Sequence, residues 1–333
     1  MNHRRIITKI AALLCAAILI AGCSGSAEPP SSAGPEHPGN GFPVTIEHML
    51  GTAVITKKPE RVVALGLADQ DIAIALGITP VAMVENPNSA DGRYPWTSDS
   101  ELDDVVLLPL ETSTASVEQI IALEPDLILA TTASGDPALY DRYADSGVPI
   151  IAPPAGAVTA SWQDLTRLIG RAVGRSDRAE DVIAETEAQV ADTRAALPGL
   201  RGKTFAVAVA SSTSAVRAVN KPTDTAAKFF ADLGMDLPPG LTELDGAGGV
   251  GAVDLSLEQL DLLDADALFL ASNDGARDSL ERSPLFERLP AVKSRTYLPY
   301  DNTTAAGLRT PTPLSIPYVL GEVRPTLERV SQG

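Results

Sequence analysis

A fourteen-residue segment that occurs twice, 140 positions apart, most limits the folds open to this chain. The first copy, residues 116–129, reads SVEQIIALEPDLIL, and the second, residues 256–269, reads SLEQLDLLDADALF. Five positions are identical, and each copy predicts a capped helix, a short turn and a strand. A solenoid would need several shorter repeats. The duplication therefore predicts two similar lobes, each with a glutamate, Glu118 or Glu258, on the first turn of a helix.

Short apolar runs alternate with helical segments on both sides of this repeat. Strands are predicted at 61–65, 80–84, 127–130 and 149–152, and again at 204–210, 215–219, 267–270 and 296–298. Helices are predicted to end at Leu76, to span 223–233 and to close the chain over 314–330. Because strands and helices alternate, the fold class is α/β, with mostly parallel sheets covered by helices on both faces.

Two helices are predicted between the copies, over 161–173 and 176–197. Ser176 is the expected cap of the second, and its apolar residues recur at spacings of three and four. At 1.5 Å per residue this helix is about 30 Å long. Its position midway between the copies favours a bridge between two lobes, although a surface helix of one lobe has the same pattern.

The N-terminus is predicted to be a lipoprotein signal over residues 1–22. Three basic residues precede an apolar run over 10–20, which is too short to span a bilayer. The Ala-Gly-Cys ending resembles a bacterial lipoprotein signal and predicts lipidation of Cys23, with ordinary signal-peptidase cleavage as the alternative. The Ser/Pro/Gly-rich residues up to 41 then form a flexible tether.

Composition excludes several functions. The formal net charge of −17 argues against a nucleic-acid partner and against electrostatic adhesion to anionic lipid. Cys15 lies in the predicted signal, so one cysteine remains and no intramolecular disulfide is possible. The three histidines are His3, His37 and His48, which makes a Ser–His–Asp triad or a multi-histidine metal site hard to build.

Enzyme motifs are absent or out of context. The string GAGGVG at 246–251 matches a dinucleotide-binding pattern, but no buried strand precedes it and the next helix starts too late. No P-loop, G-x-S-x-G elbow or Cys-x-x-Cys is present. We therefore predict no catalytic residue, no resident metal and no enzyme.

The chain resembles the periplasmic or lipoprotein substrate-binding components of ABC importers for ferric siderophores, haem and cobalamin. The matching strings are KPERVVAL at 58–65, LGITPV at 76–81, LEPDLI at 123–128, LPAVK at 289–293 and the two Ser-x-Glu-Gln segments. The resemblance implies two α/β lobes joined by a single long rigid helix, with the ligand cleft between the lobes. It places the lobes at 42–160 and 199–333, and the linking helices, including the interlobe helix 176–197, at 161–198.

The resemblance also implies a role for the paired glutamates, since one glutamate per lobe docks onto the membrane permease in that family. Helix capping alone also explains Glu118 and Glu258, and one residue can do both. The implied protein is a lipid-anchored monomer on the extracytoplasmic face of the cytoplasmic membrane. Its partners are the ABC permease and its ATPase. It needs no cofactor, because ferric iron is carried within the siderophore.

Arginine forks and aromatic faces suit anionic, flat ferric chelates. Arg93, Tyr94 and Trp96 share a loop after the second strand. The remaining candidates are Thr131 and Asn273 after equivalent strands, Arg217 near the first strand pair of the second lobe, and Tyr300 and Arg309 in a loop after the last strand.

Two alternatives stay open. A haem or corrinoid receptor of the same fold lacks a histidine ligand, although Tyr94, Tyr300 or Tyr318 remains as an axial ligand for haem. An envelope enzyme on the same scaffold lacks an identifiable nucleophile.

Overall fold

The computed structural model describes residues 41–97, 102–109, 117–132, 137–154, 160–244, 251–272 and 276–333, apart from the side chains of Leu139 and Ser211. Cys23, the predicted signal, most of the predicted tether, Ser116, Asn273 and most of the 246–251 glycine string lie outside the described residues. Within the described ranges, no helix is long and apolar enough to cross a membrane.

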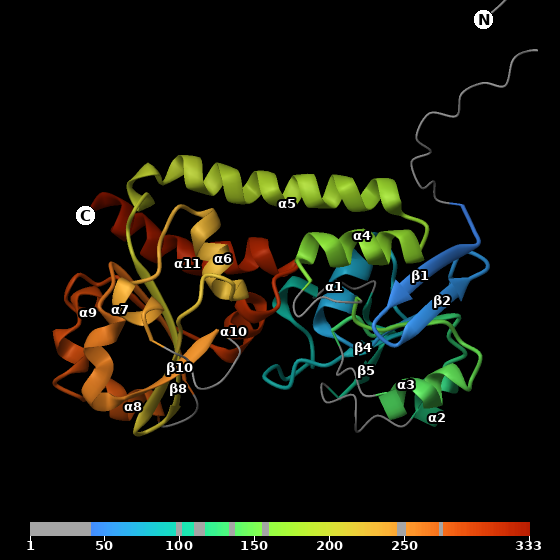
Figure 1. The fold of residues 1–333 in the computed structure, drawn as a ribbon, viewed down its shortest axis with the longest axis horizontal. Helices are drawn as coiled ribbons and strands as arrows, with labels where there is room; N and C mark the ends of the chain where they lie inside the picture. The colour runs from blue at the N-terminus through green and yellow to red at the C-terminus, as the bar shows by residue number, and fades with distance from the viewer. Residues whose placement is uncertain are drawn as a thin grey trace, which may run out of the picture. The chain divides into compact units, whose positions relative to one another are not determined.

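The first lobe contains a five-stranded parallel sheet and a separate hairpin (Figure 1). The hairpin is β1 (Val44–His48) with β2 (Gly51–Ile55), paired antiparallel. The sheet has the order β5-β4-β3-β6-β7, formed by β3 (Val62–Ala64), β4 (Ala82–Val84), β5 (Val106–Leu108), β6 (Leu127–Leu129) and β7 (Ile150–Ile151). Its helical elements are α1 (Leu67–Ala75), η1 (Pro95–Thr97), α2 (Val117–Ile121), α3 (Pro137–Ala144) and α4 (Trp162–Ala172).

The second lobe repeats the strand order with a different strand direction. Its sheet, β10-β9-β8-β11-β12, consists of β8 (Phe205–Ser212), β9 (Ala215–Val219), β10 (Ala252–Ser256), β11 (Ala267–Ser272) and β12 (Tyr297–Tyr300). The pairs β8–β11 and β11–β12 are parallel, but β8–β9 and β9–β10 are antiparallel. The helical elements are α6 (Thr225–Asp232), α7 (Pro239–Thr242), η4 (Leu257–Leu263), α8 (Ala276–Glu281), η5 (Phe286–Arg288), α9 (Pro290–Lys293), α10 (Asn302–Arg309) and α11 (Ser315–Gln332).

One long helix, α5 (Ser176–Ala196), connects the two sheets in sequence, and η3 (Pro198–Leu200) follows it. Figure 1 shows α5 alongside both lobes. Its Ala179 and Val182 belong to the core of the first lobe, whereas Val190 packs against the core of the second. The helix begins at Ser176 with Arg175 at the N-cap position, so the expected capping role of Ser176 is wrong.

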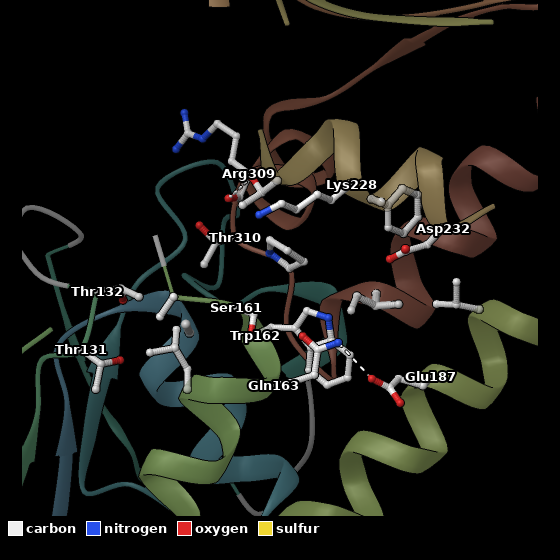
Figure 2. Close-up of a pocket in the computed structure, with 18 of the residues that line it drawn as sticks. Thr131, Thr132, Ser161, Trp162, Gln163, Glu187, Lys228, Asp232, Arg309 and Thr310 are labelled. Carbon is white, nitrogen blue, oxygen red and sulfur yellow. Dashed lines mark hydrogen bonds between the residues drawn. The ribbon is translucent and has the colours of Figure 1, made fainter. Parts of the chain in front are cut away.

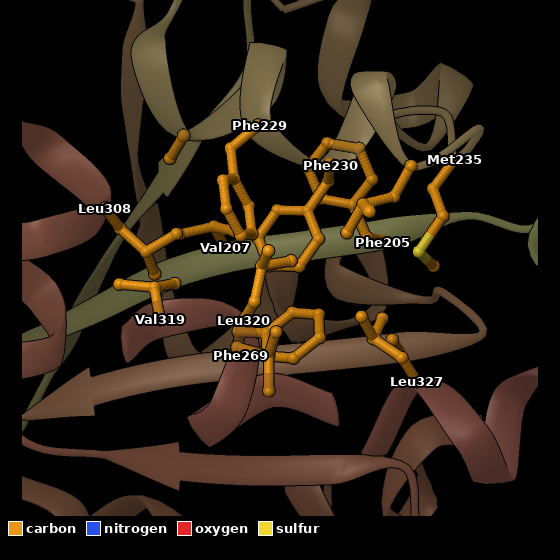
Figure 3. Packing of buried hydrophobic residues seen from close by; sticks show 14 of the residues in the cluster. Phe205, Val207, Phe229, Phe230, Met235, Phe269, Leu308, Val319, Leu320 and Leu327 are labelled. Carbon is orange, nitrogen blue, oxygen red and sulfur yellow. The ribbon is translucent and has the colours of Figure 1, made fainter. Parts of the chain in front are cut away.

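The two lobes have chemically different cores. The main cluster of the first lobe has only aliphatic buried members, among them Ile72, Leu127 and Ile169, whereas a second cluster of that lobe contains the buried Tyr143. The main cluster of the second lobe is built around stacked phenylalanines (Figure 3). Phe230 lies 4.8 Å from Phe205 and 4.4 Å from Phe269 between ring centroids, in near-parallel stacks. Offset stacks of this kind add to the stability gained from apolar burial.

The duplicated segments occupy equivalent positions, as predicted. The first copy forms α2 and β6, and the second forms η4 and β11; β6 and β11 are each the fourth strand of their sheet. The second copy is a kinked 3₁₀ segment, where a regular helix was expected. The turn backbones also differ, because Glu124 has a left-handed φ of 51° whereas the C-cap Asp264 has a φ of −61°.

Candidate functional site

The candidate site is an open cavity of about 740 Å³ whose walls come from both lobes and from α5. The first lobe contributes Thr131, Thr132 and the start of α4, and the second contributes Thr225, Lys228 and Arg309. Figure 2 shows Trp162, Gln163 and Glu187 facing Lys228 across this space. Cavities between two α/β lobes, lined by apolar surface with a few polar groups, are typical ligand sites.

Charged side chains of both signs line the cavity. Arg194, Lys228 and Arg309 are basic, whereas Glu187 and Asp232 are acidic. Glu187 accepts a hydrogen bond from the Gln163 amide, at 3.0 Å from Nε2 to Oε1. In a chain with a formal charge of −17, this concentration of basic groups provides a local attraction for an anion.

Ordered polar contacts hold the wall at the end of β6. Thr131 is buried, and both its backbone N–H, at 3.0 Å, and its hydroxyl donate to Asp69 Oδ1. Asp69 lies fully buried in the first turn of α1. Burial raises the pKa of Asp69 to about 7, because the hydrogen bonds from Thr131 and Thr132 only partly offset the loss of solvation. Thr131 is therefore held in one orientation beside the cavity.

Two of the predicted ligand residues, Thr131 and Arg309, line the cavity. Arg309 is the last residue of α10, so the expected loop after the last strand is wrong. Asp301 caps this helix by accepting the Thr304 N–H at 2.8 Å.

The structure places the other first-lobe candidates beside the cavity lining but outside it. Tyr94 is buried and stacks on Trp96, with ring centroids 5.0 Å apart. Trp96 also contacts Tyr318 of α11 and donates its indole N–H to Asp71 at 2.8 Å. The Arg93 guanidinium donates to the Leu102 carbonyl at 2.5 Å. Their role in ligand binding stays a prediction.

Tyr300 and Arg217 differ more from expectation. Tyr300 ends β12 and is a buried member of the core of the second lobe, so its placement in an open loop is wrong. Arg217 lies on β9 opposite Asp254 of β10, and two contacts of 2.8 Å join its guanidinium to that carboxylate. This fork is occupied by Asp254, so an anion would have to displace that carboxylate, and the ligand-binding role of Arg217 stays a prediction.

The paired glutamates are each the second residue of their element. Glu118 of α2 is exposed and forms a 3.0 Å ion pair with Arg142. Glu258 of η4 is also exposed, and the Gln259 side chain accepts the Ser256 N–H at 3.1 Å, as the predicted capping box requires. The local helix chemistry is thus present in the second copy, and the docking role stays a prediction.

Sequence reasoning missed Lys228, Trp162 and Arg194 as lining residues. Each lies inside a helix, where a surface position and a cavity position have the same sequence pattern. The one available signal was the capping serine Ser161, which puts Trp162 at the first position of a helix.

The haem alternative gains no support from the tyrosines. Burial raises the pKa of Tyr94 to about 12 and also raises the pKa values of Tyr300 and Tyr318, which disfavours the phenolate form that would ligate iron. Among the described residues, no cluster of three or more His, Cys, Asp or Glu side chains is placed to hold a metal ion.

Comparison with known proteins gives consistent relatives. The sequence profile of the family described as periplasmic binding protein matches residues 62–301. The Fe(3+)-citrate-binding protein YfmC of Bacillus subtilis is 27% identical over 303 residues, which cover 90% of each chain. A periplasmic solute binding protein from Mycobacterium smegmatis gives a TM-score of 0.73 at 26% identity, covering 86% of this chain and 98% of that one. Streptococcus pneumoniae PiaA, solved in complex with ferrichrome, gives a TM-score of 0.70 at 25% identity, with the same coverage.

Proposed function

This chain belongs to the periplasmic binding protein family, and we propose that it is the substrate-binding component of an ABC importer that captures ferric siderophores. Membership confirms the family resemblance read from the sequence. The relatives are named for binding ferric citrate or were solved with ferrichrome bound, and they are binding proteins. The proposal rests chiefly on the interlobe cavity, whose mixed lining includes three basic side chains, Arg194, Lys228 and Arg309, that suit an anionic chelate.

The ligand would be held between the lobes by polar groups from both. Lys228 and Arg309 from the second lobe supply positive charge, Thr131 and Thr132 from the first lobe supply hydroxyls, and Trp162 supplies a flat face. A ferric chelate with carboxylate, hydroxamate or catecholate groups presents oxygen acceptors and planar surfaces that match these donors. Iron would enter as part of the ligand, and the protein would need no cofactor of its own.

Anchoring and docking complete the proposal. Lipidation of Cys23 would tether the protein to the extracytoplasmic face of the membrane, as the lipoprotein names of several relatives support. Glu118 and Glu258 would contact the permease, one from each lobe, and the protein would act as a monomer.

Intrinsic tryptophan fluorescence tests ligand capture. Of the two tryptophans, Trp162 lines the cavity and Trp96 is packed between tyrosines, so Trp162 is the reporter and Trp96→Phe is the matched control. We expect saturable quenching by one class among ferric citrate, ferrichrome and ferric enterobactin that is lost in Trp162→Phe; Trp96→Phe should retain it and serves as the control where calorimetry gives the unsubstituted affinity, because Trp96 also donates to Asp71. Because ferric chelates absorb light, calorimetry accompanies the titration. Quenching by haem alone would contradict the proposal, and so would silence across the panel.

Charge reversal tests docking. We expect Glu118→Lys and Glu258→Lys to reduce iron uptake by cells while the affinity of the purified protein for its chelate stays unchanged. Glu287→Lys, at another exposed glutamate of the second lobe, is the control for altered surface charge. Equal loss of uptake and affinity would contradict docking.

A further inference from the structure

A buried contact between α1 and the segment before α11 connects the two lobes at a second place, apart from α5. Asp71 of α1 accepts a hydrogen bond from the Thr312 hydroxyl, with 2.7 Å between Oγ1 and Oδ2. Both residues are 0% exposed, and they lie 241 positions apart in the chain. We propose that Asp71 is a positioning residue that fixes the spacing of the two lobes, and with it the width of the cavity, through Thr312.

The Thr312 hydroxyl is oriented to donate toward Asp71. Its oxygen accepts the backbone N–H of Ser315 at 2.9 Å, and the Ser315 hydroxyl in turn accepts the backbone N–H of Thr312 at 2.9 Å. These reciprocal bonds fix the first turn of α11. The Thr312 hydroxyl has two acceptors within reach, Asp71 Oδ2 at 2.7 Å and Ser315 Oγ at 3.1 Å, and the shorter, carboxylate contact is the one that joins the lobes.

Aromatic and amide contacts surround this hydrogen bond. The Trp96 indole donates to the same Asp71 oxygen, at 2.8 Å, and its ring lies 5.0 Å from that of Tyr318 on α11. Asn86 of the first lobe lies 3.3 Å from the hydroxyl of Thr303 on α10, and both are buried. We call Asp71, Trp96, Asn86, Thr303, Thr312 and Tyr318 the interlobe junction.

The chemistry of Asp71 fits positioning better than simple stabilisation. Two donors converge on Oδ2, whereas Oδ1 is buried and has no hydrogen-bond partner among the described residues. A buried carboxyl with an unsatisfied oxygen is a costly way to gain stability, because an apolar pair of similar volume would avoid the desolvation. The carboxyl instead fixes a relative position, because its Oδ2 atom accepts one hydrogen bond from Trp96 of the first lobe and one from Thr312 of the second.

A second carboxyl on the same helix turn provides an internal control. Asp69 is also 0% exposed and also has one oxygen without a partner, but its hydrogen bonds run to Thr131 of its own lobe. Asp69 and Asp71 therefore share burial, helix and chemistry and differ in which lobe they contact. Changes at Asp69 should disturb the first lobe without altering the spacing between lobes.

The spacing can be measured without any ligand, so the outcome is separate from that of the proposed function. Spin labels at the exposed positions Asp145→Cys and Arg282→Cys report the interlobe distance by double electron–electron resonance in the purified full-length protein. A background with both Cys15→Ser and Cys23→Ser prevents labelling at the two native cysteines. Circular dichroism establishes that each variant is folded.

We expect Thr312→Val and Asp71→Ala to broaden the distance distribution and shift its mean, and the double variant to broaden it no further than either single one. Thr312→Ser restores the hydroxyl and should restore the narrow distribution. Asp71→Asn keeps one acceptor oxygen and should do the same. Asp69→Asn should leave the distribution narrow.

The proposal is overturned if Thr312→Val gives the same distance distribution as the unsubstituted protein, or if Asp69→Asn broadens the distribution as much as Asp71→Ala. If Asp71→Ala does not fold, the comparison of Thr312→Val with Thr312→Ser still tests the proposal.

Discussion

The two sheets have the same strand order, but the second strand in chain order differs in direction. It is parallel to the first strand in the first lobe and antiparallel to it in the second lobe. In the first lobe β4 is parallel to β3, so a crossover containing α1 must join them. In the second lobe β9 is antiparallel to β8, so a tight turn suffices. The crossover brings Asp69, Gln70 and Asp71 to the end of the central strand, where all three are buried. One strand reversal therefore decides which lobe carries the buried carboxyls.

The hydrophobic cores of the two lobes also differ in composition. Aromatic stacking is concentrated in the second lobe, whereas the first lobe relies on aliphatic packing and carries the polar helix start. Stability in the second lobe should therefore depend most on ring contacts, and stability in the first lobe should depend more on pH.

The largest expected effect is truncation of the central ring of the second lobe. Phe230→Ala removes two stacks and an edge contact with Phe229, and should cost about 3–5 kcal/mol of unfolding free energy. Urea unfolding followed by circular dichroism measures it. The matched first-lobe truncation, Ile72→Ala at a fully buried site, should cost about 2–4 kcal/mol, which is less because no ring contacts are lost. Equal losses would show that the cores do not differ as described.

The next effect is a pH dependence that should be larger in the first lobe, although burial also raises the pKa values of Asp224 and Asp232 in the second lobe. Burial raises the pKa values of Asp69 and Asp71 from 3.8 to about 7, so between these limits the folded protein binds more protons than the unfolded one. The unfolding free energy should fall as pH rises from 4 to 7, by up to about 1.4 kcal/mol per pH unit for each carboxyl, and stay level above that range.

Comparing the unsubstituted protein with Asp69→Asn and Asp71→Asn isolates these contributions, since each variant should lose part of the slope. The comparison is needed because the pKa of His48 is lowered by burial and contributes a slope of opposite sign. An unchanged slope in both variants would contradict the assignment.

A smaller effect compares the starts of α1 and α6. The side chain of Asp224 caps α6 by accepting the Ala226 N–H at 2.8 Å, so Asp224→Ala should cost about 1 kcal/mol. At α1 the N-cap is Gly66, where a serine would ordinarily help. A Cβ there would lie 2.8 Å from Asp69 Oδ2 and closer still to Thr132, so Gly66→Ser should instead cost about 1–3 kcal/mol. Thermal unfolding shows whether Gly66→Ser lowers the melting temperature, as the steric clash predicts. A higher melting temperature would contradict the clash.

The smallest effect concerns the turns of the two repeat copies. Glu124→Gly should stabilise the protein by up to about 1 kcal/mol, because glycine tolerates its left-handed backbone. Asp264→Gly should destabilise it by about 0.5–1 kcal/mol, because φ there is ordinary and glycine only adds freedom to the unfolded chain. Both positions are exposed, so side-chain packing should contribute little. If both substitutions changed the unfolding free energy in the same direction, the proposed difference between the turn backbones of the two copies would be contradicted.

Much of this architecture was predictable, because it rests on local patterns. The hairpin, the glycine stop after Leu76, the long helix and the helix–turn–strand of both copies follow from periodicity and turn residues. The strand reversal at β9 was not, because an isolated strand carries no mark of its direction. Helix α10 was missed because its Thr- and Gly-rich sequence has weak helical propensity, although Asp301 offered a capping signal.

The site was less predictable than the fold. Thr131 was found because it follows a strand, and Arg309 because it lies near the end of the last one. The burial of Tyr300 and the ion pair of Arg217 could not be foreseen, because both depend on partners far away in the sequence, such as Asp254, and their role in ligand binding stays a prediction. Asp69 and Asp71 resemble an ordinary acidic first turn, and only the tertiary structure covers them.

The 241 positions that separate Asp71 from Thr312 also have a consequence for the order of assembly. The strands and helices of the first lobe up to β7 all precede residue 312 in the chain, and domains generally fold as units with the N-terminal one first. Asp71 should therefore stay exposed to water until α10 and α11 have formed. The contact between Asp71 and Thr312 should form in the last step of folding, and a chain that stops before this step would have a nearly complete first lobe in which Asp71 is still exposed.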